Sequence, residues 1–438
     1  MRHEKLIAKA IYRFDAQLDT PISIGCSDSY FTDHDIIRSN SGEIIIPGSS
    51  IAGSIGSYVK SRNDQTLSFF KIEEKLASPF SISDGLLTSE VSSRTRDGVA
   101  ILGYENEVFE KTAKNTAKFD YEIIPTDSTF FFIIEITLRE NFASYIPSLK
   151  SFDYAKDALN FIEKQIQEVA GRFNNHEIRL GFKKNRGLGC IHIKSLKGRK
   201  FIKNDENDDL SEYLDYLNGK IELNSLDIPN NLQANSLCIE IPIQMLGGLS
   251  IKSYTENPEV SYDYTQLDHN GKAVIPGSAI CGALRHQMEK IAKELNCNMD
   301  LEELFGTSSE NDSNPHSSEL VAEECYLADG HFLLSTRTAI DRFTGSALNQ
   351  SLFTQKIYVN GSTTLRFYIN KKEKLKSFIG LFLLAIKDLL NGYCSIGGST
   401  SIGYGIVKGK EILVDDKPID IENNEYITAL AERISQNE

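Results

Sequence analysis

The pattern of apolar and polar positions repeats along the chain: an alternating segment, a helix-like segment, and later a longer amphipathic segment. The predicted elements, in matched pairs, are strands at 5–25 and 237–244, helices at 51–62 and 280–295, and helices at 154–173 and 375–390. With strands between the helices, this is the order of an α+β unit built on an antiparallel sheet. We therefore expect a ferredoxin-like, or RRM-like, core in each half.

Three sequence landmarks indicate an internal duplication. Residues 45–53 (IIPGSSIAG) align without a gap with 274–282 (VIPGSAICG). Glycine-rich segments at 180–189 and 396–405, and arginine-containing segments at 93–103 and 336–345, occur in the same order in each half. A repeated order of landmarks predicts two tandem copies of one domain.

The predicted domains are 1–197 and 236–412, with a polar linker at 198–235 and a partly helical tail at 413–438. Two domains agree with the length of 438 residues, because single cores stop growing at roughly 250–300 residues. A second polar stretch at 307–318, rich in Ser, Asn and Asp, is predicted to be a loop.

Composition narrows the function classes. The formal net charge of −14 excludes a uniformly basic surface, so any RNA contact has to be local. The seven cysteines form no CxxC pair, which argues against structural zinc and for reduced, mostly buried thiols. The sequence has no run of about 18 apolar residues and no apolar segment at its start, so we expect a cytoplasmic protein.

The two Pro-Gly-Ser motifs lie where a predicted strand runs into a helix. The candidate phosphate contacts are Gly48, Ser49 and Ser50 in the first half, and Gly277 and Ser278 in the second. Backbone N–H groups at a helix start favour a phosphate, and glycine lets another backbone approach closely. The alternative is an ordinary helix start in which Ser49 and Ser278 are N-caps.

The two glycine loops differ in charge. The first has Lys183, Lys184 and Arg186, and it is followed by further basic positions, namely Lys194, Lys197, Arg199, Lys200 and Lys203. The second has Ser399 and Thr400, which can only hydrogen-bond. We expect both loops to contact RNA, the first through phosphates; the alternative for the basic run is a solvated surface.

The Pro-Gly-Ser helix start, the Gly-x-Gly loop and residues 337–345 (RTAIDRFTG) together resemble the RAMP superfamily, in particular backbone subunits of type III CRISPR effector complexes. Two such domains on one chain resemble the tandem-fused subunits of subtype III-D. The resemblance implies a thumb β-hairpin in each domain, expected at 99–120 and 339–354. It implies as partners guide crRNA, complementary target RNA, other RAMP subunits and the large signalling subunit.

The resemblance also implies a metal-dependent endoribonuclease whose catalytic aspartate precedes the Pro-Gly-Ser helix. The candidates are Asp33, with Asp28 and Asp35 as competitors, and in the second half Asp263, with Asp268 as competitor. A gap-free alignment places Tyr262 opposite Asp33, and a loop shift of one residue selects Asp263. Asp33 and Asp263 would hold Mg²⁺ or Mn²⁺ or orient the attacking 2′-hydroxyl; a turn or cap role is the alternative.

Three arginines complete the expected RNA contacts. Arg94 and Arg337 precede the expected thumbs, and Arg285 follows the second Pro-Gly-Ser motif, where the first half has Gly56. The family often has a lysine before the helix glycine, but this chain has alanine and cysteine there. Guide contacts from these helices are therefore expected to be weaker than is usual.

Two other functions stay open. The chain could be a non-catalytic RNA-binding scaffold in the same complex, with one or both aspartates idle. A guide-processing RAMP endoribonuclease is the third candidate, but its chemistry usually relies on a positioned histidine, and the eight histidines of the chain show no repeated placement.

Overall fold

The computed structural model of the chain describes residues 5–25, 34–62, 66–71, 78–88, 94–99, 118–203, 210–230, 232–254, 262–307 and 316–437. The chain forms two compact units. The first comprises residues 1–184 and 188–234, and the second comprises residues 185–187 and 235–438.

The first unit is built on an antiparallel sheet. Its strands are β1 (Leu6–Leu18), β2 (Ile45–Ile46), β3 (Phe80–Ile82), β4 (Gly85–Leu87), β7 (Thr129–Arg139), β8 (Ile191–Ile202) and β9 (Asn224–Leu226). The central order is β8-β1-β7-β3, and every neighbouring pair is antiparallel. A separate two-stranded sheet pairs β5 (Arg94–Val99) with β6 (Lys118–Ile123).

Helices cover one face of this sheet. The described helices of this unit are α1 (Gly48–Arg62), α2 (Phe142–Tyr145), α3 (Ala155–Asn174) and α4 (Ser211–Leu217), with 3₁₀ turns η1 (Ser68–Phe70) and η2 (Pro147–Leu149). The apolar sides of α1 and α3 share one core with the inward residues of β1 and β7, where the Phe14 and Phe132 rings stack 4.7 Å apart. The exception is α4, whose Tyr213 contacts Phe201 of β8.

The second unit repeats this plan. Its main sheet has β10 (Ser236–Met245), β16 (Leu320–Ala322), β20 (Ser362–Asn370), β21 (Val407–Gly409), β22 (Leu413–Val414) and β23 (Lys417–Pro418). The remaining strands are β11 (Gly248–Leu249), β12 (Lys252–Tyr254), β13 (Tyr264–Gln266), β14 (Asp268–His269), β15 (Lys272–Ile275), β17 (Cys325–Tyr326), β18 (His331–Ile340) and β19 (Ala347–Val359). The central order β21-β10-β20-β16 matches that of the first unit.

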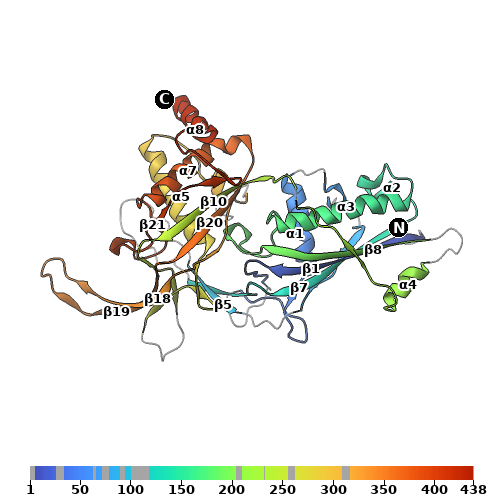
Figure 1. The fold of residues 1–438 in the computed structure, drawn as a ribbon, viewed down its shortest axis with the longest axis horizontal. Coiled ribbons are helices and arrows are strands. Elements are labelled where there is room, and N and C mark those ends of the chain that lie inside the picture. Colours follow the sequence, from blue (N-terminus) through green and yellow to red (C-terminus); the bar gives the residue numbers. More distant parts are fainter. Residues whose placement is uncertain are drawn as a thin grey trace. The chain divides into compact units, whose positions relative to one another are not determined.

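The helices of the second unit are α5 (Gly277–Glu294), α6 (Glu302–Phe305), α7 (Lys376–Leu390) and α8 (Glu425–Asn437), with the 3₁₀ turn η4 (Glu373–Leu375). Helix α7 is apolar on nearly all sides and is buried beneath α5 and α8 (Figure 1). Its Phe382 ring meets Phe367 of β20 at 5.1 Å. Strands β18 and β19 form a long hairpin that projects from the rest of this unit (Figure 1).

Both units thus have the β-α-β-β-α-β order of a ferredoxin-like fold, which confirms the predicted α+β class. The helices expected at 154–173 and 375–390 are α3 and α7. The first strand ends at Leu18 instead of residue 25, because the chain bends there and continues as isolated bridges. Of the linker expected at 198–235, residues 198–234 belong to the first compact unit and contain the end of β8, α4 and β9, and residue 235 begins the main part of the second unit.

The β18–β19 hairpin is the predicted second thumb. For the first thumb the structure describes the paired stems β5 and β6, while residues 100–117 lie outside the described residues. Of the expected loop at 307–318, residues 308–315 also lie outside them. None of the described helices combines the length and apolar character needed to cross a membrane.

Candidate RNA interface and aspartate loops

The glycine of each Pro-Gly-Ser motif is buried against a strand. A Cβ on Gly48 would lie 2.2 Å from the carbonyl oxygen of Ile82, the last residue of β3. A Cβ on Gly277 would lie 2.2 Å from the carbonyl oxygen of Ala322, the last residue of β16. Backbone packing therefore requires glycine at both positions, independently of RNA.

The helix starts differ from the predicted N-caps. Helices α1 and α5 begin at the glycines, so Ser49 and Ser278 lie inside the first turn and are not the cap residues. In the first unit, Asp84 accepts the Gly48 N–H at 2.8 Å and takes over the capping role. A phosphate at this N–H would have to displace Asp84, a contact that no local sequence pattern indicated. Ser49 is exposed, and Ser50 and Ser278 are half-buried.

The two glycine loops close in the same way. The N–H of Leu180 bonds to the carbonyl of Gly189 at 2.9 Å, and the N–H of Ile396 bonds to the carbonyl of Gly405 at 2.9 Å. Each loop then anchors to the segment after the first strand. The Phe182 N–H donates to the backbone carbonyl of Ser23 at 2.7 Å.

The corresponding bond in the second unit runs from the Gly398 N–H to the backbone carbonyl of Ser250 at 2.8 Å, so Ser250 is the counterpart of Ser23. The backbone conformation agrees residue by residue. Lys183 and Ser399 both have positive φ, at 53° and 59°, and a 3₁₀ turn follows each of them. These turns are η3 (Lys184–Arg186) and η5 (Thr400–Ile402).

The three basic residues of the first glycine loop, Lys183, Lys184 and Arg186, have different structural environments. The Lys183 ammonium sits 3.9 Å from the centre of the Tyr121 ring, as a cation–π pair. Burial lowers the pKa of Lys184. Arg186 ends η3 and belongs to the second compact unit.

The basic run on β8 is partly neutralised. Lys200 pairs with Glu163 at 2.9 Å, and Arg199 pairs with Glu212 at 3.4 Å. Lys194 is exposed. Two of these basic side chains thus have protein partners, and Lys194 is solvated, as in the alternative of a solvated surface.

The first aspartate loop is described from His34 onward. Asp33 and Asp28 lie outside the described residues, and Asp35 is buried, which argues against a phosphate contact through its carboxylate. The buried Glu122 of β6 holds the end of this loop. Its carboxylate accepts the Ile36 N–H at 2.9 Å and pairs with Arg38 at 2.7 Å. Sequence reasoning missed Glu122, because only strand pairing brings it to the loop.

The second aspartate loop is held by the aspartate itself. Asp263 is exposed, and its Oδ2 accepts the backbone N–H of Thr354 at 2.9 Å. Its own N–H bonds to the Thr354 carbonyl at 2.8 Å. Asp268 instead accepts the Gly271 N–H at 3.0 Å in the β14–β15 turn. Asp268 therefore has the turn role that we considered as the alternative.

Strand registers allow the two aspartate loops to be compared. In the first unit, Ile22 bridges to Ile124, and His34 bridges in parallel to Tyr121, three residues upstream of Ile124. Ile22 directly precedes Ser23, the residue that anchors the first glycine loop. These contacts give the position of His34 relative to the glycine loop.

The second unit repeats this register. Leu249, which precedes the loop anchor, pairs with Tyr358. Tyr264 pairs in parallel with Gln355, three residues upstream of Tyr358. Tyr264 is therefore the structural counterpart of His34.

The arginines of the third sequence landmark are not counterparts. Arg94 pairs with Ile123 in the first unit. The counterpart of Ile123 is Ile357, which pairs with Leu333 instead of Arg337. The sequence alignment of these two segments is therefore out of register with the structure. Similar sequences lie at different positions along the paired strands of the two hairpins.

Arg337 and Arg285, which were expected to contact RNA, both contact protein groups. Arg337 donates to the Tyr404 hydroxyl at 2.6 Å and stacks over its ring, which ties the β18–β19 hairpin to the second glycine loop. Arg285 pairs with Glu289 at 3.3 Å on the exposed side of α5.

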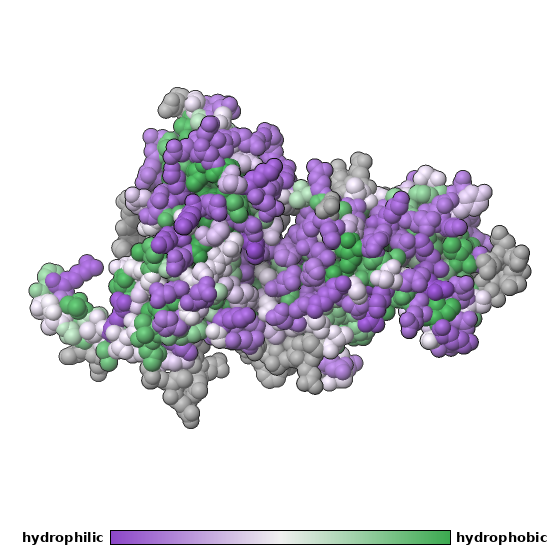
Figure 2. All heavy atoms as spheres, viewed as in Figure 1, coloured by the Kyte–Doolittle hydropathy of each residue, from purple (hydrophilic) through white to green (hydrophobic). Residues whose placement is uncertain are grey.

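The turn of the β18–β19 hairpin presents apolar residues. Hydrogen bonds from Thr344 and Phe343 close the turn and hold the pKa of Asp341 below its ordinary value. Phe343 is 99% exposed. Figure 2 shows apolar surface on this hairpin, as expected for a thumb that contacts another molecule.

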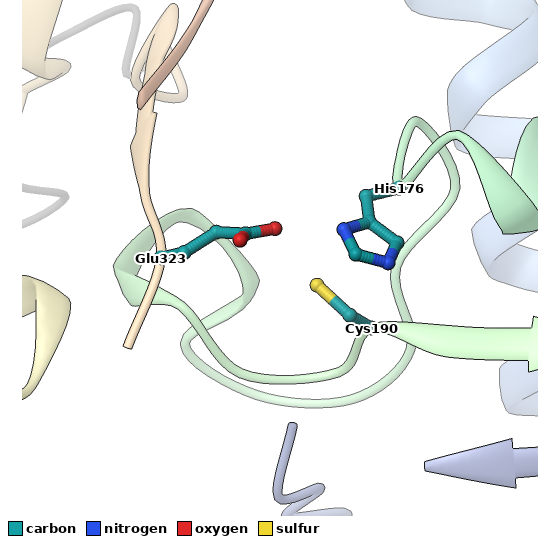
Figure 3. Close-up of side chains that lie close together, drawn as sticks. All are labelled: His176, Cys190 and Glu323. Atoms are coloured by element: carbon teal, nitrogen blue, oxygen red, sulfur yellow. The ribbon is translucent and has the colours of Figure 1, made fainter. Parts of the chain in front are cut away.

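Figure 3 shows His176, Cys190 and Glu323, three residue types that can ligate metals. His176 and Cys190 belong to the first unit and Glu323 to the second, so no metal centre within either unit follows from them. His176 Nε2 lies 3.0 Å from an Asp19 carboxylate oxygen. The cysteines among the described residues are free thiols, mostly buried, as predicted.

The RAMP superfamily model matches residues 15–192 and 242–408, one region in each half. The chain therefore belongs to the RAMP superfamily, and the predicted tandem arrangement is confirmed. RAMP proteins are CRISPR-associated, bind RNA and work in complexes with other subunits, and some are ribonucleases. No curated protein matches the chain in sequence.

Proposed function

We propose that the chain is a tandem-fused backbone subunit of a type III CRISPR ribonucleoprotein, which binds guide crRNA and cleaves complementary target RNA. The supporting observation is the equivalence of two chain positions. Asp33 directly precedes His34, Asp263 directly precedes Tyr264, and His34 and Tyr264 occupy the same strand register. Two equivalent carboxylates on tandem domains suit an enzyme that cuts one RNA strand at regular intervals.

The residues fit a metal that is shared with RNA. Mg²⁺ commonly binds through one or two carboxylates together with substrate phosphates, and each half offers one such aspartate. Bound there, Mg²⁺ or Mn²⁺ would stabilise charge on the scissile phosphate. The part played by the protein would be to position the aspartate: Asp263 itself pairs with Thr354, and His34, which follows Asp33 in the sequence, pairs with Tyr121.

One observation favours a second candidate function for the second half. The Oδ2 atom of Asp263 already bonds to the Thr354 backbone, so this carboxylate has a structural role. In this alternative the second half binds RNA as a scaffold, and only the first half cleaves.

The test is cleavage of a complementary target RNA by the assembled complex, in Mg²⁺ and in EDTA. Asp33→Ala and Asp263→Ala should each slow the appearance of a different product by roughly 10²-fold or more. Guide binding by the double variant should be retained. Asp268→Asn is the matched control, because an amide oxygen can still accept the Gly271 N–H.

Three outcomes separate the candidates. Cleavage that survives both alanine substitutions would show that these aspartates are not the catalytic groups. An effect of Asp33→Ala alone would assign the scaffold function to the second half. An unaltered complex that binds target RNA without cutting it would make both halves scaffolds.

A further inference from the structure

A small pocket lies beside the first aspartate loop. Ser23, Gly25, His34 and Phe182 line it, and its volume is about 160 Å³. Gly25 and His34 are the described residues that flank the segment containing Asp33. In the sequence, the pocket residues therefore adjoin the segment that contains the candidate catalytic residue of the first unit.

The walls of the pocket suit a flat aromatic ring. The rings of His34 and Phe182 lie 5.4 Å apart at 48°. Phe182 is 44% exposed, although it lies on a loop that the backbone holds firmly. Exposed aromatic faces on a fixed backbone bind nucleobases by stacking.

One residue that lines the pocket has a buried hydroxyl. Ser23 is 1% exposed, and within the described part of the chain its Oγ has no hydrogen-bond partner. Its counterpart Ser250 bonds through Oγ to Gln355 at 3.4 Å, and the residue at the Gln355 position in the first unit is Tyr121. Because an unsatisfied buried hydroxyl is unfavourable, the pocket of the first unit suits a ligand with a polar edge.

A cation stands beside the aromatic wall. The Lys183 ammonium lies 5.2 Å from the centre of the Phe182 ring. Lys183 directly follows Phe182 in the sequence, and its φ is positive. A ring face, a hydroxyl and an ammonium together match the three parts of a nucleotide that proteins contact, which are the base face, the base edge and the phosphate.

The second unit has different residues at the same positions. Gly398 stands in place of Phe182, and Lys252 stands in place of Gly25. The Lys252 ammonium lies 4.6 Å from the centre of the Tyr264 ring, the counterpart of His34. The aromatic wall and the open glycine position are therefore features of the first unit.

We propose that this pocket of the first unit binds one unpaired nucleobase of an RNA strand. The base stacks on Phe182, its polar edge bonds to Ser23, and Lys183 contacts the adjoining phosphate. Pockets for whole small-molecule ligands usually exceed roughly 300 Å³, so the observed volume fits a single base. The choice of RNA as the ligand rests on the proposed function.

The experiment compares two short single-stranded RNA probes bound to the full-length protein, one intact and one with abasic sugars at every position. Both carry the same phosphate charge, so the affinity ratio isolates the contribution of the bases. Phe182→Ala and Gly25→Lys should each lower affinity for the intact probe about tenfold and leave the abasic probe unchanged. Lys183→Gln should weaken both probes alike.

Tyr154→Ala is the matched control, since Tyr154 is 72% exposed in the same unit and lies outside the pocket. Phe182→Ala removes a partly exposed ring from a loop, so it keeps the test valid if Gly25→Lys fails to fold. The proposal is overturned if the unaltered protein binds both probes equally, or if Phe182→Ala leaves the affinity ratio unchanged.

This outcome is separable from the nuclease test. Base-dependent binding without target cleavage would retain the pocket and reject the catalytic role. Cleavage through Asp33 with an unchanged affinity ratio in Phe182→Ala would do the opposite.

Discussion

Lys183 and Ser399 are equivalent positions in the two glycine loops. The backbones of these loops agree in the positive φ of this residue, in the hydrogen bond that closes the loop and in the 3₁₀ turn that follows. Around this shared backbone the side chains have diverged: the first loop has an exposed phenylalanine and two lysines, and the second has glycine, serine and threonine. After duplication, backbone packing kept the loop shape, while side chains that face outward were free to change. Equal shape in the two units therefore does not imply equal RNA binding.

The aspartate loops differ in the same way. In the first unit a β6 side chain, Glu122, reaches the loop backbone; in the second, the loop side chain Asp263 reaches the β19 backbone. The counterpart of Glu122 is Lys356, which cannot accept an N–H. The two halves thus hold equivalent segments by opposite polar contacts.

The largest expected effects test the shared loop closure. Gly189→Ala and Gly405→Ala would each place a Cβ about 2 Å from the carbonyl oxygen of Leu180 or Ile396, at a positive φ. We expect each to lower the free energy of unfolding of its own unit by about 4 kcal/mol, because clash and strain add. Chemical denaturation of full-length variants measures this.

The control for this comparison is Gly403→Ala, because Gly403 also has a positive φ (86°, against 78° for Gly405) but no atom within 4 Å of the added Cβ. It should cost only about 1–2 kcal/mol. Equal losses for Gly403→Ala and Gly405→Ala would show that strain, and not the close approach, makes glycine necessary.

The next test concerns the two helix starts. Gly48→Ala and Gly277→Ala should each destabilise by about 3 kcal/mol, because the Cβ meets a strand carbonyl. Gly53→Ala lies within α1 with no atom within 4 Å of its Cβ, and should be neutral or stabilise by about 0.5–1 kcal/mol. If Gly48→Ala were also neutral in thermal unfolding, the packing explanation for the Pro-Gly-Ser motif would fail.

A smaller effect separates the two aspartate loops. Glu122→Ala leaves Ile36 N–H and Arg38 without their carboxylate, so we expect a loss of about 2 kcal/mol. Cleavage at the first-half site should fall, and cleavage at the second-half site should not. Lys356→Ala is the matched control. A loss of both products in Glu122→Ala would indicate general unfolding instead of local positioning.

The smallest expected effect distinguishes the two glycine loops by charge. Lys183→Gln should reduce the slope of log affinity against log salt by about 0.7–1 for single-stranded RNA. Ser399→Ala should leave the slope unchanged, because the serine releases no counterion. Titrations at several salt concentrations measure both, and equal slopes for the two variants would contradict a phosphate contact by Lys183.

Much of the fold could be predicted because its signals are local. The amphipathic spacing at 154–173 and the apolar run at 375–390 correspond to α3 and α7. The paired Pro-Gly-Ser and glycine-loop motifs located the two domains. The N-cap role of Ser49 was wrong, because Asp84, far along the chain, caps the helix. The equivalence of Arg94 and Arg337 was wrong, because strand register depends on pairing partners that a linear alignment does not contain.

The amino-acid sequence by itself determined the duplication, the order of helices and strands, and the glycine positions that the two halves share. These features are patterns of residues that are near one another in the sequence. Tertiary structure decided why the glycines are needed, because the carbonyls that approach Gly48 and Gly189 come from strand packing and loop closure. It also decided which polar groups are satisfied. Ser23 and Ser250 are the same residue in matching segments, yet only Ser250 meets a glutamine, because residues more than ninety positions away complete each site.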